Sequence, residues 1–334
     1  MRSITQQRQD LFEKIQKVAP ANFAELALAV FKYQATFNPV FKEYISLLNV
    51  DCQKITTVED IPFLPIQFFK NKEIKTGNWS PAATFSSSGT TSETTSSHQL
   101  FSPDFYKKNA RHGFQQFYGN VQDYCVLALL PSYLERSGSS LIFMAADFIE
   151  QSKYAESGFF LNNVEELLAI LKDLQKRKIP TLLMGVSFAL LDLAERFPRD
   201  LSNIIIMETG GMKGRRKEIT RGELHQIFNQ AFQTSNIHSE YGMTELFSQA
   251  YSKGKGIFFP SPIMRVLARE VTDPLQIQKT GKTGVLNIID FANLDTCSFI
   301  ATDDLGRVNA DDSFEILGRL DASDVRGCNL LVLS

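Results

Sequence analysis

The sequence predicts an α/β fold with a large parallel-sheet part and a small β-rich subdomain. From about residue 105 to 260, apolar runs of strand length alternate with longer runs that carry a helical apolar face. After Pro260 the pattern changes to short strands between Gly, Asn and Asp turns, expected at 285–290, 297–302 and 313–317. We therefore expect three parts: a helical segment at 1–80 that packs on the core, an α/β core at 81–260 and a β-rich subdomain at 261–334.

The N-terminal segment is expected to form two helices over residues 8–48. Asn22 is available as an N-cap, and Pro39 should divide the helical stretch. The apolar face follows the spacing i, i+3, i+4, i+7 and i+8, through Phe23, Leu26, Ala27, Val30 and Phe31. A proline-stiffened connection at 61–70 leads into the next part.

The α/β core is expected to contain strands at 124–130, 181–186, 204–207 and 234–238. Helices should begin at two capping-box patterns, Asn163-x-x-Glu166 and Thr220-x-x-Glu223. Strands that alternate with helices favour a largely parallel sheet, and ligands of such sheets gather at the carboxyl ends of the strands. Two polar, Gly-containing runs follow predicted strands, at Glu208-Thr-Gly-Gly211 and Ser239–Glu245.

Composition places the chain in the ordinary globular class, because 43% of its 334 residues are hydrophobic and 22% are charged. A net charge of −2 gives no general attraction to nucleic acid or an anionic membrane. No apolar run is long enough for a transmembrane helix, and residues 1–20 lack the apolar region of a signal peptide. Because no CxxC pair or metal-ligand spacing occurs, we expect a reduced, cytoplasmic protein with Cys52, Cys125 and Cys297 in the core.

A Ser/Thr-rich run at 85–98 has almost no apolar side chain, so it cannot lie in a core. Small residues around Gly89 let a backbone turn tightly and direct several N–H and O–H groups at one anion, such as a phosphate. The run is not a Walker loop, because the G-x-x-x-x-G-K-[ST] spacing is absent. The alternative is a Ser/Thr-rich surface linker.

Four stretches, taken in order, resemble motifs of the adenylate-forming superfamily, which includes acyl-CoA and aryl-CoA ligases. They are Ser87-Ser-Gly-Thr-Thr91 (phosphate loop), Tyr241-Gly-Met-Thr-Glu245 (Y-G-x-T-E), Thr302-Asp303 (T-G-D) and Gly318-Arg-Leu-Asp321 with Arg326-Gly327 (G-R-x-D…R-G). The resemblance implies the N-terminal domain type of that superfamily. Within the superfamily, the chain most resembles the acyl-protein synthetase subunit of bacterial fatty-acid reductase. The features that carry this resemblance are the short length, the E-T-G-G segment, residues 130–136 and the terminal R-G-C.

The resemblance also implies ATP and Mg²⁺ as cofactors, with a role for each motif. The loop would hold the β and γ phosphates through Ser86, Ser87, Ser88, Gly89, Thr90 and Thr91, and Glu245 would help to hold Mg²⁺. The adenine would be contacted by Tyr241 with Gly242, Gly210 and Gly211, and the ribose by Asp303. Thr244 would hydrogen-bond the α-phosphate, and Arg319 would reach the ribose or the α-phosphate. A carboxylate that attacks this phosphate needs fixed donors and cations around it, because like charges repel.

Two features depart from the superfamily pattern. Where the loop usually ends in lysine, this chain has Thr94-Thr95, with His98 as the nearest titratable group. The sequence also stops just after the hinge motif, so we expect it to lack the usual C-terminal domain with its catalytic lysine. Either His98, Lys213 or a partner's side chain supplies that charge, or adenylation is slow or absent.

Cys328 is the candidate acyl acceptor, since the synthetases that the chain resembles carry the acyl group as a thioester on a cysteine near the C-terminus. Nearby Arg326 favours a thiolate, whereas the alternative is a small buried hydrophobic residue. The resemblance implies a fatty or aryl carboxylic acid as substrate, and an acyl-CoA-reductase-like protein or an acyl carrier as partner; no nucleic-acid partner is expected. Two other classes stay open: a nucleotide- or acyl-binding module with reduced catalysis, and a serine hydrolase that uses His98, although no G-x-S-x-G elbow is present.

Overall fold

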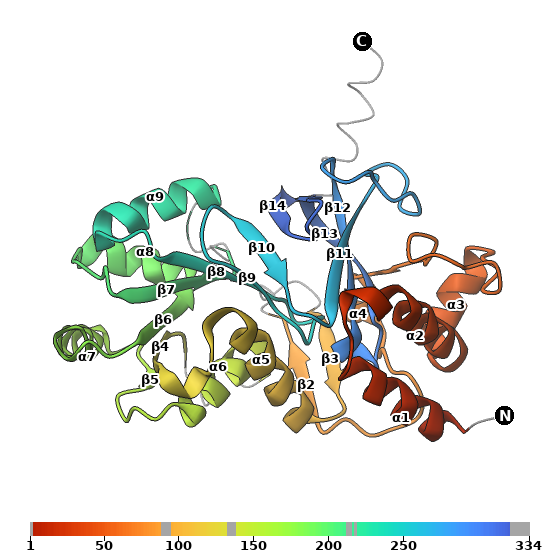
Figure 1. Ribbon diagram of the computed structural model, residues 1–334, viewed down its shortest axis with the longest axis horizontal. Helices are drawn as coiled ribbons and strands as arrows, with labels where there is room; N and C mark the ends of the chain where they lie inside the picture. Colours follow the sequence, from red (N-terminus) through yellow and green to blue (C-terminus); the bar gives the residue numbers. More distant parts are fainter. Residues whose placement is uncertain (1–2, 88–94, 132–137, 212–215, 217–218, 321–334) are drawn as a thin grey trace, which may run out of the picture. The chain divides into compact units, whose positions relative to one another are not determined.

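The computed structural model describes residues 3–87, 95–131, 138–211, 216 and 219–320 (Figure 1). The chain divides into two compact units, each of which we describe by itself. Unit 1 comprises Met1–Pro103, Glu245–Ser248 and Pro260–Ser334, and unit 2 comprises Asp104–Thr244 and Gln249–Phe259. These boundaries differ from the three expected parts, because the N-terminal helices and the C-terminal strands pack together in unit 1.

Unit 2 is built on a mainly parallel sheet, as the sequence predicted. Its strands are, in spatial order, β5 (Gly158–Phe159), β4 (Cys125–Leu129), β6 (Thr181–Val186), β7 (Ile204–Thr209), β8 (Ile237–Tyr241), β9 (Ala250–Ser252) and β10 (Ile257–Pro260). The strands from β5 to β8 are parallel, and β9 is antiparallel to β8. All residues of β4 and β6 are buried, which explains their uninterrupted apolar sequences.

The helices of unit 2 cover both faces of this sheet (Figure 1). They are α5 (Pro103–Tyr118), α6 (Ser140–Gln151), α7 (Val164–Arg177), α8 (Ser187–Arg196) and α9 (Arg221–Phe232). In Figure 1, α8 and α9 lie on one face, and α5 and α6 lie on the other. At the start of α9 the predicted capping box of Thr220 and Glu223 is present. At α7 it is not, because the amide of Asn163 donates to the Glu166 carboxylate instead of capping the backbone.

One strand boundary in unit 2 was predicted incorrectly. The sequence placed a strand at 234–238 and a loop from Ser239 onward, whereas β8 runs from Ile237 to Tyr241 and all its residues are buried. The polar residues of β8 are tolerated in the sheet because they have buried partners. Thr209 donates to the carboxylate of Glu240, and the Ser239 hydroxyl lies 3.3 Å from Nε2 of His225.

Unit 1 begins with three helices where the sequence predicted two. They are α1 (Ile4–Ile15), α2 (Phe23–Phe37) and α3 (Pro39–Leu47), followed later by the short α4 (Phe68–Asn71). The predicted break at Pro39 is confirmed, and the Asn38 side chain caps α3 by accepting from the Phe41 N–H at 3.0 Å. The additional break arises at Pro20, which begins a short 3-10 turn. Two further 3-10 turns are Val121–Asp123, in unit 2, and Phe291–Asn293.

The β-rich part of unit 1 is an antiparallel sheet, which confirms the predicted change of architecture after Pro260. Its strands are β11 (Met264–Arg269), β12 (Thr283–Asp290), β13 (Phe299–Val308) and β14 (Phe314–Arg319), and β1 (Leu64–Pro65) adds to β13 in parallel. Phe299 on β13 contacts the rings of Phe31, Phe41 and Phe63, with centroid distances of 6.0, 6.1 and 6.0 Å. This aromatic core joins segments from both ends of the sequence.

A separate hairpin in unit 1 carries the ends of the Ser/Thr-rich loop. It consists of β2 (Ala83–Ser86) and β3 (Ser97–Leu100), which pair antiparallel. Beyond the hairpin, the Ser87 N–H donates to the Ser96 carbonyl at 3.0 Å, and the Ser96 N–H donates to Ser87 Oγ at 2.9 Å. The two ends of the loop are therefore held together.

Within the described part of the chain, none of the helices combines the length and the apolar character that crossing a membrane requires.

Candidate functional site

The predicted site residues fall into two groups, one in each compact unit. Unit 1 contains Ser86, Ser87, His98, Glu245, Asp303 and Arg319. Unit 2 contains Gly210, Gly211, Tyr241, Gly242 and Thr244. Thr244 and Glu245 are consecutive, so the chain passes from unit 2 to unit 1 inside the Tyr241–Glu245 motif. Ser88, Gly89, Thr90, Thr91, Lys213 and Cys328 lie outside the described residues.

Glu245 is held in unit 1 by buried polar groups next to β12. The side-chain amide of Asn293 donates to the Glu245 carbonyl at 2.8 Å. Asp290, at the end of β12, accepts from the N–H groups of Phe247 and Ser248 at 2.9 and 2.8 Å. These contacts fix the backbone from which the Glu245 side chain projects.

The Glu245 carboxylate lies beside the base of the Ser/Thr-rich loop and beside β14. It accepts a hydrogen bond from the Ser96 side chain and interacts electrostatically with Arg319 and with the like-charged Asp304. Burial raises the pKa of the Glu245 carboxyl, although the Ser96 hydrogen bond and the Arg319 charge act to lower it. Burial is the largest influence on this carboxyl, and a divalent cation beside it would favour its ionised form.

Asp303 and Arg319 lie close together on neighbouring strands. Cross-strand pairing sets Arg319 opposite Asp304, and Nη2 of Arg319 is 4.0 Å from Oδ2 of Asp303. The Arg319 side chain is 66% exposed, so this ion pair is weak and the guanidinium is accessible to a ligand. Thr302, the first residue of this motif, is buried and its hydroxyl donates to the Leu286 carbonyl at 2.8 Å. Thr302 thus joins β13 to β12.

Gln67 is a contact of Asp303 that sequence reasoning missed. Its Nε2 lies 2.8 Å from both carboxylate oxygens of Asp303. The parallel register of β1 on β13, with Leu64 opposite Ile300, brings position 67 to position 303. The only signal in the sequence was the proline-stiffened connection itself, which marked an ordered segment without indicating its partner.

His98, on β3, lies in the interior of unit 1. Its side chain is completely buried, and its ring stacks on Phe247 with a centroid distance of 3.9 Å and an interplanar angle of 8°. The edge of Phe69 packs against it at 5.1 Å, and Nε2 is 2.7 Å from the Thr296 hydroxyl. These contacts hold the imidazole of His98 in the interior of unit 1.

In unit 2, Tyr241 and Gly242 stand at the carboxyl end of β8. The Tyr241 ring contacts Phe258 at 6.0 Å in an edge-to-face arrangement. A Cβ at position 242 would lie 2.6 Å from Oε1 of Glu240, so a side chain there would displace a buried carboxylate. Thr244 follows on the partly exposed stretch after the strand.

Gly210 and Gly211 form an exposed turn after β7. Gly210 has a φ of +62°, the left-handed conformation that glycine adopts without strain. Its carbonyl accepts a hydrogen bond from the buried Ser187 hydroxyl. The exposed backbone at this turn agrees with the close approach of a flat ring that the motif resemblance implies.

The described cysteines agree only in part with their predicted burial. Cys125 and Cys297 are buried, and burial raises the pKa values of their thiols to about 11 and about 12. Cys52 is only partly buried, which corrects its assignment to the core.

His238 lies beside the Tyr118 hydroxyl at 3.1 Å, and burial lowers its pKa to about 4, as suits a structural histidine.

The described residues contain no group of three or more His, Cys, Asp and Glu side chains that could hold a metal ion by themselves. Two carboxylates, Glu245 and Asp304, interact electrostatically, and the Ser96 side chain bonds to Glu245. Oxygen donors of this kind suit Mg²⁺, which proteins commonly hold through one or two carboxylates together with phosphate oxygens of the substrate.

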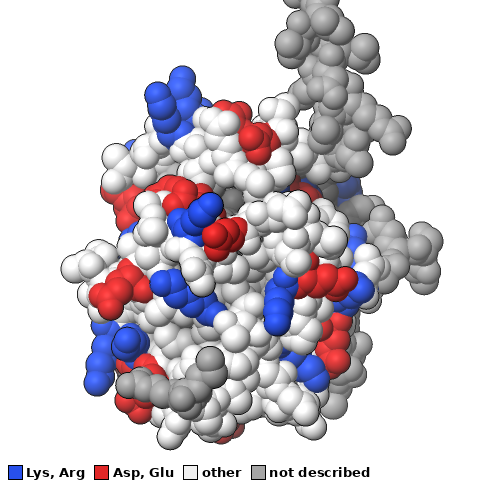
Figure 2. Space-filling model, turned by 90° about the vertical axis from the view of Figure 1, so that its right-hand side faces the viewer, with Lys and Arg blue, Asp and Glu red and all other residues white. Residues whose placement is uncertain are grey.

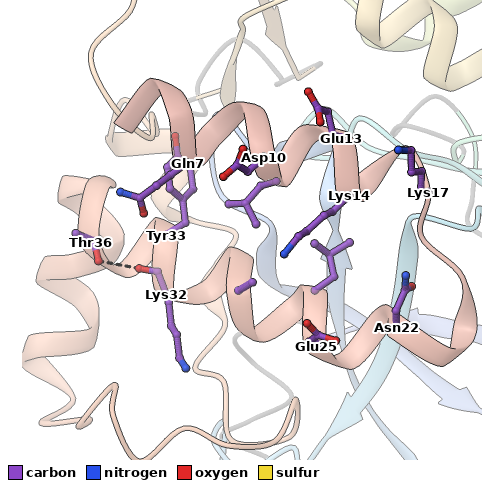
Figure 3. Close-up of a pocket in the computed structure, with 13 residues that line it drawn as sticks. Gln7, Asp10, Glu13, Lys14, Lys17, Asn22, Glu25, Lys32, Tyr33 and Thr36 are labelled. Carbon is purple, nitrogen blue, oxygen red and sulfur yellow. Dashed lines mark hydrogen bonds between the residues drawn. The ribbon is translucent and has the colours of Figure 1, made fainter. Parts of the chain in front are cut away.

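An open groove of about 740 Å³ lies between α1 and α2 of unit 1 (Figure 3). Its charged lining residues are Asp10, Glu13, Lys14, Lys17, Glu25 and Lys32. The two signs balance, and the face in Figure 2 likewise carries basic and acidic residues interspersed. Since none of the predicted site residues lines this groove, it is not a candidate for the same site.

Comparison with known proteins identifies the fold. A scan against models of protein families finds no match, and neither does a search of curated proteins. Among solved structures, ATP-bound MatB from Rhodopseudomonas palustris matches with a TM-score of 0.53 and 17% identity over 72% of this chain. The open conformation of a 2-hydroxyisobutyryl-CoA ligase, in complex with 2-HIB-AMP and CoA, matches with a TM-score of 0.62 and 12% identity over 91% of this chain.

The chain spans 48% of the matched MatB chain and 76% of the matched 2-hydroxyisobutyryl-CoA ligase chain. At these identities the likeness concerns the fold alone. It confirms the predicted fold class, an α/β architecture with a parallel-sheet part and a smaller antiparallel part.

Proposed function

We propose that this chain activates a carboxylic acid with ATP to form acyl-AMP and then transfers the acyl group to a thiol. The observation that most supports this is the grouping of Glu245, Ser96 and Arg319 in unit 1. These residues come from three distant parts of the sequence, and two of them belong to motifs that resemble those of adenylate-forming enzymes. The fold likeness to a CoA ligase bound to an acyl adenylate points to the same chemistry.

In the proposed arrangement, the hydroxyl and N–H groups of residues 86–91 bind the β and γ phosphates of ATP. Glu245 would help to hold Mg²⁺, with Asp304 as a second carboxylate that interacts with it electrostatically. Both groups offer the hard oxygen ligands that Mg²⁺ prefers. Bound to ATP, Mg²⁺ would neutralise phosphate charge and make pyrophosphate a better leaving group.

The substrate carboxylate oxygen forms a bond to the α-phosphorus as the bond between that phosphorus and the α–β bridging oxygen breaks. Arg319 and Thr244 stabilise the charge on the α-phosphate, and Asp303 accepts from the ribose hydroxyls. Tyr241, beside Gly242, packs on adenine, while Gly210 and Gly211 let the purine approach the backbone. Pyrophosphate leaves with the electron pair of the broken bond.

In the second step a thiolate attacks the acyl carbonyl carbon and AMP leaves, giving a thioester. We propose Cys328 or the thiol of a carrier as the acceptor, as in the acyl-protein synthetase type of enzyme. The acid would be a fatty or an aryl acid, and an acyl-CoA-reductase-like protein would be a fitting recipient.

The test uses the full-length protein with Mg²⁺, ATP and a panel of radiolabelled aliphatic and aromatic acids. Acyl-AMP and pyrophosphate should form with at least one acid, in amounts that depend on ATP. If no acid gives either product at any Mg²⁺ concentration, the proposal is wrong. A second candidate is a nucleotide- or acyl-binding module with reduced catalysis, because the loop has Thr94-Thr95 where the superfamily usually has lysine. Tight ATP binding without pyrophosphate release, even with partner protein added, would support that candidate.

Replacing the proposed acceptor separates the two steps. Cys328→Ser should abolish covalent labelling of the protein and leave acyl-AMP formation intact, and Cys52→Ser is the matched control. Equal labelling of Cys328→Ser and the unchanged protein would rule out Cys328 as the acceptor.

A further inference from the structure

Glu208, at the carboxyl end of β7, is a buried carboxylate with several partners in unit 2. It is only 2% exposed. Arg221 Nε donates to its Oε1 at 2.9 Å, and the Ser187 hydroxyl lies 3.1 Å from its Oε2. His225 Nε2 is 3.5 Å from Oε1. The Glu208 carboxylate is thus contacted by two residues of α9 and by the first residue of α8.

The positions of Arg221 and His225 follow from the capped start of α9. The capping box of Thr220 and Glu223 fixes where the helix begins. Residues four apart share one helix face, so Arg221 and His225 both point toward the end of β7. The charged form of Glu208 is favoured: burial by itself would raise its pKa, but the His225 hydrogen bond and the Arg221 charge bring the pKa down to about 2.

Two contacts connect this network to the proposed adenine-binding residues. On one side, Ser187 bonds both the Glu208 carboxylate and the Gly210 carbonyl. A hydroxyl has a single proton to share between these acceptors, so the Gly210 turn and the carboxylate are fixed by the same group.

On the other side, the Arg221 guanidinium lies over the Phe258 ring at 4.8 Å, and Phe258 packs edge-to-face on Tyr241. Arg221 therefore contacts both Glu208 and the ring that supports Tyr241. A continuous series of contacts thus leads from the Glu208 carboxylate through Arg221 and Phe258 to the Tyr241 ring.

We propose that Glu208 and Arg221 are positioning residues for base recognition: together they fix the Gly210–Gly211 turn and the Tyr241 ring on which adenine is bound. This inference rests on the proposed function. Neither side chain is required to touch the nucleotide. They act by keeping two separate adenine contacts in one relative geometry, so they should affect the choice of base more than the binding of phosphate.

The test is calorimetric titration of the full-length protein with Mg²⁺–ATP and with Mg²⁺–GTP. Glu208→Gln keeps the shape of the side chain but removes its charge, and Arg221→Lys keeps the charge but loses the planar guanidinium. We expect Glu208→Gln to raise the Kd for ATP about tenfold, as when a hydrogen bond to a charged group is lost, and to leave the Kd for GTP nearly unchanged. Arg221→Lys should raise the Kd for ATP about threefold in the same base-dependent way.

Glu156→Gln is the matched control, since Glu156 also pairs with an arginine, Arg177, but at the surface of unit 2. It should change neither Kd. If Glu208→Gln does not fold, Arg221→Lys provides the test of the inference. Arg221 is partly exposed, so its replacement disturbs the fold less. Unchanged Kd values in a folded variant, or equal weakening of ATP and GTP, would overturn the inference. Absence of ATP binding by the unaltered protein would instead contradict the proposed function itself, and the inference with it.

Discussion

Glu208 in unit 2 and Glu245 in unit 1 are both buried glutamates, 2% and 6% exposed, but their electrostatic surroundings differ. The pKa of Glu208 is lowered, because Arg221 and His225 outweigh the effect of burial. The pKa of Glu245 is raised, because its Ser96 bond and the exposed Arg319 do not outweigh burial and the like charge of Asp304. Similar burial thus accompanies opposite pKa shifts, because the hydrogen bonds and the Arg221 charge around Glu208 outweigh its burial, whereas the partners of Glu245 do not.

This difference suggests different roles. A fully partnered carboxylate is a structural support, since removing it leaves a cation without its partner. A buried carboxylate with too few partners is unstable in its charged form until a ligand supplies positive charge, and such groups gather at functional sites. On this view Glu208 positions the nucleotide site, and Glu245 takes part in it.

The largest effect is expected for Glu245→Gln. Removing the proposed Mg²⁺ ligand should lower the rate of acyl-AMP formation by at least about 100-fold, the scale on which a fixed electrostatic group contributes. Stability should not fall, because the variant no longer buries a poorly compensated charge. Pyrophosphate release and thermal unfolding, measured on the same preparation, check both expectations. Loss of stability with retained activity would reverse the roles assigned to the two glutamates.

An intermediate effect is expected for Glu208→Gln on the free energy of unfolding. At pH 7 the variant should be less stable by roughly 2–3 kcal/mol, because Arg221 and His225 lose their anionic partner. The folded-state pKa of about 2 lies below the ordinary value of 4.5, so ionised Glu208 stabilises the fold above pH 4.5, and this stabilisation is lost as the pH falls toward 2.

Denaturant titrations between pH 7 and pH 3 test this pH dependence. The unaltered protein should lose more stability than Glu208→Gln across the acid range, so the two curves should converge as the pH falls. Parallel curves would mean that Glu208 does not titrate differently in the folded and unfolded states. Glu156→Gln again provides the comparison with a surface pair.

The smallest effect is expected for Gln67→Ala. Because Gln67 holds both oxygens of Asp303, its loss should let that carboxylate rotate and raise the Kd for ATP about threefold. Gln175→Ala, which removes an amide that donates to the Asp200 carbonyl, is the control. An ATP analogue without ribose hydroxyls should bind the Gln67→Ala variant and the unaltered protein equally. A loss of the same size with that analogue would show that Gln67 does not act through the ribose.

The architecture could be predicted from the sequence where one physical signal dominated. The structure confirms three predictions that rest on local patterns. These are the buried runs of β4 and β6, the capping box of α9 and the turn-separated strands after Pro260. The end of β8 was missed because its polar residues resemble a loop until their partners on β7 and α9 are known. The grouping of both chain ends in unit 1 depends on long-range packing around Phe299, which leaves no local signal.

Motifs in the sequence indicated candidate site residues, but not the partners of these residues in the fold. Glu245 and Arg319 were identified from short patterns, and they interact in unit 1. His98 was chosen for its closeness in sequence to the loop, yet the alternation of side chains along β3 turns it into the core, where it stacks on Phe247. Gln67, Asp290 and Arg221 were missed because each acts through a contact with a residue far away in the sequence.

The most direct test of the account is ATP–pyrophosphate exchange by the full-length protein, measured with and without a carboxylic acid. The account predicts exchange that requires the acid and Mg²⁺, and that is lost in Glu245→Gln and Arg319→Gln while both variants stay folded. Equal exchange in these variants and in the unaltered protein would contradict the assignment of the unit 1 residues. Absence of exchange with every acid tested would contradict the proposed chemistry.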